Sequence, residues 1–136
     1  MIDIENVIYT ELAEKLRETF PDIHLSGEYV NAPPGFPYVS FVEQDNYTPM
    51  FHRDSSSTER FAMLLYEVNV YCNKGTGRKA LCRKIMTLID DFMYAKNFVR
   101  ISLAPVPNLE NGTIYRLTAR YRAETDGTNL YRPTSY

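Results

Sequence analysis

The sequence predicts an α+β fold in which two helices pack on one face of a mostly antiparallel sheet of about four to five strands. Two segments repeat apolar residues at spacings of three and four, which is typical of amphipathic helices. Other segments alternate apolar and polar residues, as half-buried strands do. The order is helix, two strands, a long polar loop, a strand, a helix and two strands. Residues 1–124 are expected to form a single domain and residues 125–136 an extended C-terminal tail.

The first helix is expected to have Asp3 as its N-cap and to end before Pro21, whose ring cannot continue a helix. A short strand around Ile23 and Leu25 follows, and residues 32–37, with three prolines and a glycine, form a stiff extended connection. The apolar stripe of this helix consists of Ile4, Val7, Ile8, Leu12, Leu16 and Phe20.

Residues 38–43 are predicted to form the second strand, followed by a long polar loop over residues 45–58. A loop of this length in a small domain is often functional. His52, Arg53 and Asp54 are therefore candidate residues of an assembly loop.

The strand at 60–72 and the last strand at 113–124 both alternate cleanly. Between them, Gly75 and Gly77 precede a second helix, and residues 98–103 form a strand that ends at Pro105. The buried stripe of the second helix is predicted to be Leu81, Ile85, Leu88, Ile89 and Phe92. The sheet face away from the helices is expected to be polar and open, and to carry Glu67, Asn69, Arg116, Arg120 and Arg122.

Cations gather at the start of the second helix and carboxylates near its end, so that both oppose the helix macrodipole. Such charges cost about 0.3–1 kcal/mol each, and a sequence that keeps them often uses them in a contact outside the helix. The alternative is that long basic side chains simply extend into water. Candidate interface or channel residues are therefore Lys74, Arg78, Lys79, Arg83 and Lys84, together with Arg116, Arg120 and Arg122 on the last strand.

Composition narrows the function classes. The formal net charge of −2 argues against a surface built wholly for nucleic acid. Cys72 and Cys82 fit neither a CxxC pair nor a zinc pattern and are expected to be free buried thiols. We see no secretory signal and no apolar run of membrane-spanning length.

The motifs of catalysis are weak. The glycines of residues 75–80 match a G-x-G-x-x-A pattern, but no βαβ unit and no acidic ribose partner accompany them, so they indicate a tight turn. His24 and His52 are too scattered for a metal site, and the carboxylates Asp90 and Asp91 are consecutive on a helix. We predict no catalytic residue, no cofactor and no metal, and a protein that is not an enzyme.

The order of elements, with the strand Leu65-Tyr66-Glu67-Val68-Asn69-Val70-Tyr71 and the closing strand Tyr115-Arg116-Leu117-Thr118-Ala119-Arg120-Tyr121, resembles the tail-terminator (tail-completion) and head–tail neck proteins of long-tailed bacteriophages. The resemblance implies a structural virion subunit that forms a ring, typically a hexamer. The ring would cap the tail tube and join the head. Its partners would be copies of itself, the tube protein and neck or connector proteins, with DNA passing through the channel without sequence recognition. The protein would be found in the virion and, during assembly, in the host cytoplasm.

One alternative stays open from the residues alone. The basic patch at 74–84 and the arginines at 116–122 could serve a small nucleic-acid-binding or regulatory protein. An acidic first helix with Glu11, Glu14 and Glu18, together with basic patches elsewhere, favours head-to-tail self-association instead.

Overall fold

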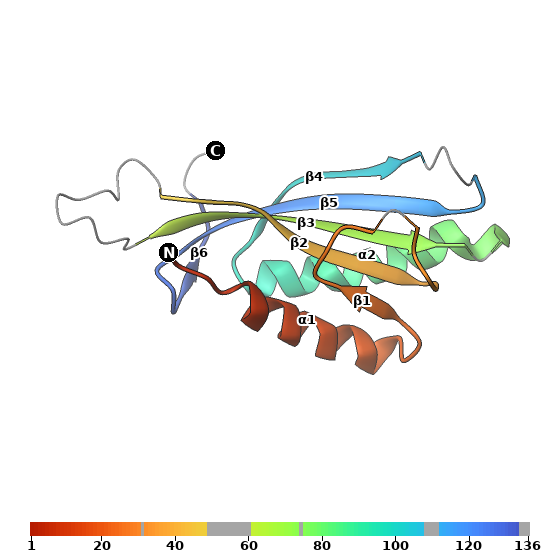
Figure 1. Ribbon diagram of the computed structural model, residues 1–136, viewed down its shortest axis with the longest axis horizontal. Coiled ribbons are helices and arrows are strands. Elements are labelled where there is room, and N and C mark those ends of the chain that lie inside the picture. Colours follow the sequence, from red (N-terminus) through yellow and green to blue (C-terminus); the bar gives the residue numbers. More distant parts are fainter. Residues whose placement is uncertain (31, 49–60, 74, 108–111, 134–136) are drawn as a thin grey trace.

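The computed structural model describes residues 1–30, 32–48, 61–73, 75–107 and 112–133. Two helices lie on one face of a curled, mostly antiparallel sheet (Figure 1), which confirms the predicted α+β class. The helices are α1 (Glu5–Thr19) and α2 (Arg78–Ala95). The strands are β1 (His24–Ser26), β2 (Tyr38–Tyr47), β3 (Ala62–Cys72), β4 (Val99–Val106), β5 (Tyr115–Thr125) and β6 (Leu130–Tyr131).

The long strands β2, β3 and β5 form the middle of the sheet. The strand order is β1-β2-β3-β5-β4, with β6 paired to the end of β5. β1 runs parallel to β2, and the other pairs are antiparallel. β3 and β5 pair without interruption from Ala62 opposite Thr125 to Cys72 opposite Tyr115. Their predicted alternation is thus confirmed, and it fixes which side chains face the helices.

The core lies between this sheet and the two helices. Tyr66 and Tyr121, which pair across β3 and β5, are both fully buried there. Leu81 and Leu88, predicted as core residues of α2, are only partly buried, and Val7 of α1 is 56% exposed. The buried side of each helix therefore differs slightly from the predicted apolar stripe. The helices bury Ile8, Leu12, Ala13 and Leu16 from α1, and Cys82, Ile85, Met86, Ile89, Phe92 and Met93 from α2.

The ends of three elements differ from the prediction. β2 continues to Tyr47 instead of ending at residue 43, because a bulge between Glu43 and Asp45 lets the strand stay paired with β3. β4 continues through Pro105 to Val106, which an edge strand tolerates because it has a free side. Helix α1 begins at Glu5 with Ile4 as its N-cap, so the prediction of Asp3 as the N-cap is wrong by one residue. Asp3 Oδ1 still accepts a hydrogen bond from the backbone N–H of Glu5 at 3.3 Å.

The described residues after β5 turn back on the sheet. Asp126 Oδ1 accepts hydrogen bonds from the backbone N–H groups of Thr128 and Asn129, and β6 then pairs with Glu124 and Thr125. The division into a domain at 1–124 and a tail at 125–136 remains a prediction.

The two cysteines are free and buried, as expected. Among the described helices, none has the length and apolarity needed to cross a bilayer.

Candidate functional site

The start of α2 presents a cluster of cations to solvent. A 3-10 turn, Gly75–Gly77, leads into the helix, and Gly75 has the positive φ of 41° that glycine accepts without strain. The N-cap is Gly77, which supplies no side-chain cap, and the first turn contains no acidic residue. We call Arg78, Lys79, Arg83 and Lys84 the basic helix start; the predicted fifth member, Lys74, lies outside the described residues.

These cations have few partners in the part of the chain that the structure describes. Arg78 Nη1 donates to the carbonyl of Gly75 at 3.3 Å, which holds one guanidinium over the turn. The side chains of Lys79, Arg83 and Lys84 are exposed and make no ion pair with any described residue. The basic helix start is therefore free for a contact with another molecule.

The two carboxylates near the end of α2, Asp90 and Asp91, have different environments. Asp90 Oδ1 accepts hydrogen bonds from Arg100 Nη1 at 3.1 Å and from the Tyr121 hydroxyl at 2.9 Å. Burial raises the pKa of Tyr121, and the negative charge of Asp90 raises it further. Asp90 therefore anchors α2 to the sheet, whereas Asp91 is exposed on the side toward α1.

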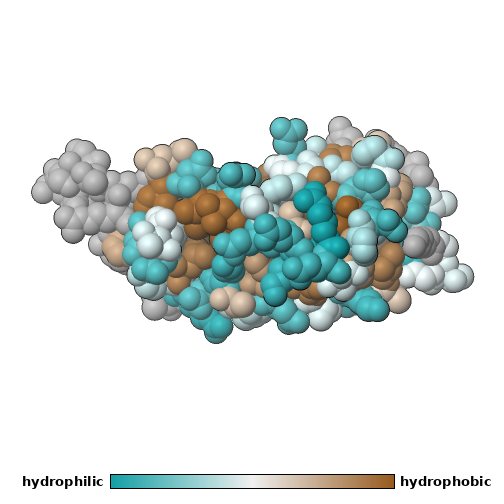
Figure 2. Space-filling model, turned by 90° about the horizontal axis from the view of Figure 1, so that it is seen from below, coloured by the Kyte–Doolittle hydropathy of each residue, from teal (hydrophilic) through white to brown (hydrophobic). Residues whose placement is uncertain are grey.

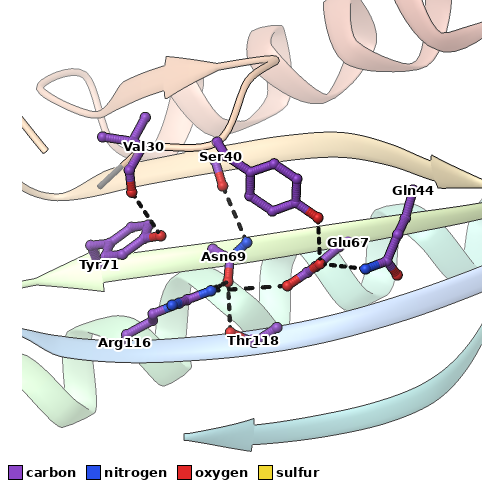
Figure 3. A network of polar contacts seen from close by, with 9 residues as sticks. Val30, Ser40, Gln44, Glu67, Asn69, Tyr71, Arg116 and Thr118 are labelled. Carbon is purple, nitrogen blue, oxygen red and sulfur yellow. Dashed lines mark hydrogen bonds and ion pairs between the residues drawn. The ribbon is translucent and has the colours of Figure 1, made fainter. Parts of the chain in front are cut away.

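On the opposite face of the sheet, Arg116 is held inside a polar network (Figure 3). Its Nε and Nη2 donate to Asn69 Oδ1 at 3.0 and 2.8 Å. Nη2 also lies 3.9 Å from Glu67 Oε1, and the guanidinium stacks over the Tyr71 ring at 5.5 Å. Arg116 is thus already bonded within the chain and is a poor candidate for a channel or interface residue.

The network continues across three strands. The Thr118 hydroxyl donates to Asn69 Oδ1 at 2.6 Å, and Asn69 Nδ2 donates to the Ser40 hydroxyl at 3.3 Å. Tyr29, from the segment after β1, and Gln44 each donate to Glu67 Oε2 at 2.8 Å. Glu67 keeps 5% of its surface exposed and Asn69 none. The prediction of a polar face is confirmed, but the prediction that the face is open is wrong here, because side chains of neighbouring strands and Tyr29 cover these two residues.

Arg120 and Arg122 behave differently from Arg116. Arg120 is exposed and has no ion-pair partner among the described residues, while Arg122 Nε is buried without a hydrogen-bond partner there. Arg78 and Arg116 line one shallow hollow of about 350 Å³ beside Tyr115. Among the other predicted cations in the described ranges, Lys79, Arg83 and Lys84 lie on α2, and Arg120 and Arg122 lie on the opposite face of the sheet.

The sequence prediction missed a groove between the helices. It has a volume of about 530 Å³, and we call it the acidic groove. Its apolar floor includes Leu88 and Phe92, and Lys96 closes one end through an ion pair with Glu11 and a contact over the Phe92 ring at 5.8 Å. Figure 2 shows hydrophilic side chains over the middle of this face, where the helices lie. The rim is formed by Glu11, Glu14, Lys15, Glu18, Thr19, Asp91, Ala95 and Lys96.

Part of this groove was visible in the sequence. Glu14 and Glu18 are four residues apart, so they share one side of α1 and repel each other. What the sequence could not show is that Asp91 joins them, because that depends on how the two helices are paired.

Two other predictions concern an assembly loop and a metal site. The candidate assembly loop with His52, Arg53 and Asp54 lies outside the described residues. Within the described ranges, no three His, Cys, Asp or Glu side chains are grouped closely enough to hold a metal ion.

Comparison with known proteins gives a distant structural likeness. No protein-family model matches the chain. No curated protein matches it. Among solved structures, the chain is similar to the sheath/tube terminator, in the extended state, of the extracellular contractile injection system PVC, with a TM-score of 0.46 and 10% sequence identity. The match covers 96% of this chain and 60% of that chain, so this chain spans less than two thirds of its length.

Proposed function

We propose that the chain is a structural subunit that assembles with copies of itself into a ring, and that this ring ends the tail tube of a long-tailed bacteriophage or a tail-like particle. The observation that carries the proposal is the basic helix start. Arg78 and Lys79 lie in the first turn, where the helix already presents partial positive charge, and Arg83 and Lys84 follow in the next turn. Lys79, Arg83 and Lys84 are exposed without an ion-pair partner among the described residues.

This arrangement lowers the free energy of unfolding of the isolated subunit. Each of the two charges in the first turn, Arg78 and Lys79, costs about 0.3–1 kcal/mol at low salt, and less where water screens it. Carboxylates of another molecule would attract these cations and offset the unfavourable interaction with the helix dipole. The chain carries a formal net charge of −2, so a second copy can supply such carboxylates. Because unlike surfaces then meet, the contact is head-to-tail, and such contacts close into rings when the rotation allows.

The finer expectations belong to the same proposal. The ring would contain about six copies, contact the tube protein on one side and neck or connector proteins on the other, and let DNA pass without reading its sequence. It would be part of the virion, built in the host cytoplasm. This role requires no catalysis. Arg120, exposed on the other face of the sheet, is the arginine of that row with most freedom to meet a neighbour or DNA.

The nucleic-acid alternative is weakened by the positions of the cations. Arg116 is engaged by Asn69, Glu67 and Tyr71. Arg120 lies on the sheet face opposite α2, so the exposed cations do not form one continuous track for a phosphate backbone.

Light scattering on size-exclusion fractions over a wide concentration range tests the proposal, with negative-stain images of the largest species. We expect a closed ring of about six copies that dissociates as salt is raised, because salt screens exposed charges. A compact dimer at every concentration, together with salt-dependent binding of non-specific duplex DNA, would favour the alternative and contradict the ring.

A further inference from the structure

We infer that the acidic groove of one copy receives the basic helix start of the next copy. The inference rests on the proposed role as a self-assembling subunit, and it names the surface on which that assembly depends. Both halves of the contact lie on the helix layer, outside the polar network of the opposite sheet face.

The two surfaces are complementary in charge. Glu14, Glu18 and Asp91 line the groove and make no ion pair with any described residue, whereas Glu11 is already paired with Lys96. The cation Lys15 also lines the groove, so these three carboxylates outnumber the unpaired cation there. Lys79, Arg83 and Lys84 are exposed and equally free of ion pairs in the described chain. Three carboxylates therefore face three cations if the helix start enters the groove.

The two surfaces are also complementary in spacing. Glu14 and Glu18 are four residues apart on α1, and Lys79 and Arg83 are four apart on α2. Four residues rise about 6 Å along a helix, so two helices lying side by side bring both pairs into register. Within each helix the like charges repel by about 0.2–0.5 kcal/mol per pair, and this repulsion disappears when each charge gains an opposite partner.

The exposed stripe of α2 has a shape that can enter a groove. At about 100° per residue, Lys79, Ala80, Arg83 and Lys84 fall on one side of the helix, opposite the buried Cys82 and Ile85. Ala80 is small and exposed, so it permits a close approach to the floor at Leu88 and Phe92. The long stems of Lys and Arg can pack on that floor while their charges reach the rim.

The contact has to join two molecules. α2 continues past the end of α1, so the basic helix start projects beyond the two-helix layer (Figure 1). On the same helix, Lys79 and Asp91 are twelve residues apart, which is about 18 Å along a rigid axis. Lys79 therefore cannot reach Asp91 of its own groove and is available to the groove of a neighbour.

Charge reversal provides the test. The groove variant carries Glu14→Lys and Glu18→Lys, and the helix variant carries Lys79→Glu and Arg83→Glu. We expect each variant alone to raise the dissociation constant for self-association at least about a hundredfold, because like charges now meet. Mixed in equal amounts, the two variants should assemble again, because each groove then meets a helix start of opposite charge. A chain with all four changes should assemble by itself.

Matched controls separate this contact from general charge effects. Glu28→Lys changes an exposed carboxylate on the segment after β1, and Arg17→Glu reverses a charge on the side of α1 away from the groove. Both controls should leave the dissociation constant unchanged within about twofold. Circular dichroism and thermal unfolding of every variant verify that the fold is intact.

Three outcomes would overturn the inference. If both reversed variants form the same rings as the wild type, the contact lies elsewhere, while the proposed ring subunit stands. If the variants lose assembly but the mixture does not regain it, the charges do not meet each other. If the wild type is monomeric up to about 1 mM, or binds duplex DNA through Lys79 and Arg83 in competition with self-association, both the contact and the ring are contradicted.

Discussion

The buried network around Asn69 makes a sharp prediction about stability. Asn69 is fully buried, and its Oδ1 accepts hydrogen bonds from Arg116 Nε, Arg116 Nη2 and the Thr118 hydroxyl. Asn69→Leu keeps the volume but removes this acceptor. The guanidinium is then left with Glu67 at 3.9 Å, the Tyr71 ring at 5.5 Å and the solvent that its 27% exposed side chain can reach.

The magnitude follows from these contacts. A hydrogen bond to a charged group contributes about 1.5–3 kcal/mol, and a neutral one about 1 kcal/mol. Because water can replace part of the lost bonding to Arg116, we expect Asn69→Leu to lower the free energy of unfolding by about 3 kcal/mol. Thr118→Val, which removes a single neutral bond, should cost about 1 kcal/mol.

A double-mutant cycle shows whether the loss comes from the unpaired guanidinium. Arg116→Met in the Asn69→Leu background removes the charge that was left without its acceptor. The double variant should therefore be more stable than the sum of the single losses predicts, with a coupling energy of about 2 kcal/mol. Urea unfolding followed by circular dichroism at pH 7 measures this, and an unchanged slope with denaturant supports the comparison. A loss below about 1 kcal/mol for Asn69→Leu, or additivity within about 0.5 kcal/mol, would refute the reasoning.

Three further predictions concern other groups. Burial raises the pKa of Glu43, so the folded state binds more protons than the unfolded state between the ordinary value of 4.5 and the raised value, and the free energy of unfolding falls as pH rises through that window. Glu43→Gln should therefore be more stable than the wild type at pH 7 and lose this advantage in acid. A variant that is less stable than the wild type in urea unfolding at pH 7 would contradict this. The pKa of Cys82 is raised by its neighbour Cys72 and by burial, and both cysteines are buried. Neither thiol should therefore react with a thiol reagent in the native protein, and both should react in denaturant. Labelling of the folded protein at the rate of a small free thiol would contradict this prediction. Arg120→Gln should leave the melting temperature within about 2 °C of the wild type, whereas Arg116→Gln should lower it by about 6–10 °C, roughly what a loss of about 2 kcal/mol implies for a domain of this size. Equal melting temperatures would place Arg116 outside the network.

The sequence predicted the fold better than the ends of its elements. The alternation of β3 and β5 was readable because one face of each strand packs on the helices, and burial enforces the period of two. The extension of β2 to Tyr47 was not readable, because it depends on a bulge at Gln44 that shifts the register by one residue. A polar stretch of this kind has the composition of a loop, and only its pairing with β3 makes it a strand.

The candidate site was predicted in part. The basic helix start could be seen from spacing alone, because residues close in sequence stay close on a helix. The different environments of Arg116 and Arg120 could not, because both lie on the same face of β5 at a spacing of four. The two arginines have different neighbours on β3, because Arg116 is opposite Tyr71 and Arg120 is opposite Glu67. Asn69 lies between Glu67 and Tyr71 on that face of β3 and accepts a hydrogen bond from Arg116. That information is held in the register between distant strands.

The position of β3 has a consequence for how the chain folds as it is made. β3 is flanked by β2 and by β5, and β5 is separated from it in the chain by α2 and β4. At about 5–20 residues per second, the ribosome needs roughly 3–10 s to extend the chain from residue 72 to residue 125. Through that interval the edge of β3 that later pairs with β5 stays unpaired, and such an apolar edge is a template for pairing with other chains. Premature termination before β5 is therefore expected to yield aggregates, and a newly made subunit becomes competent to join an assembly only when its synthesis is nearly complete.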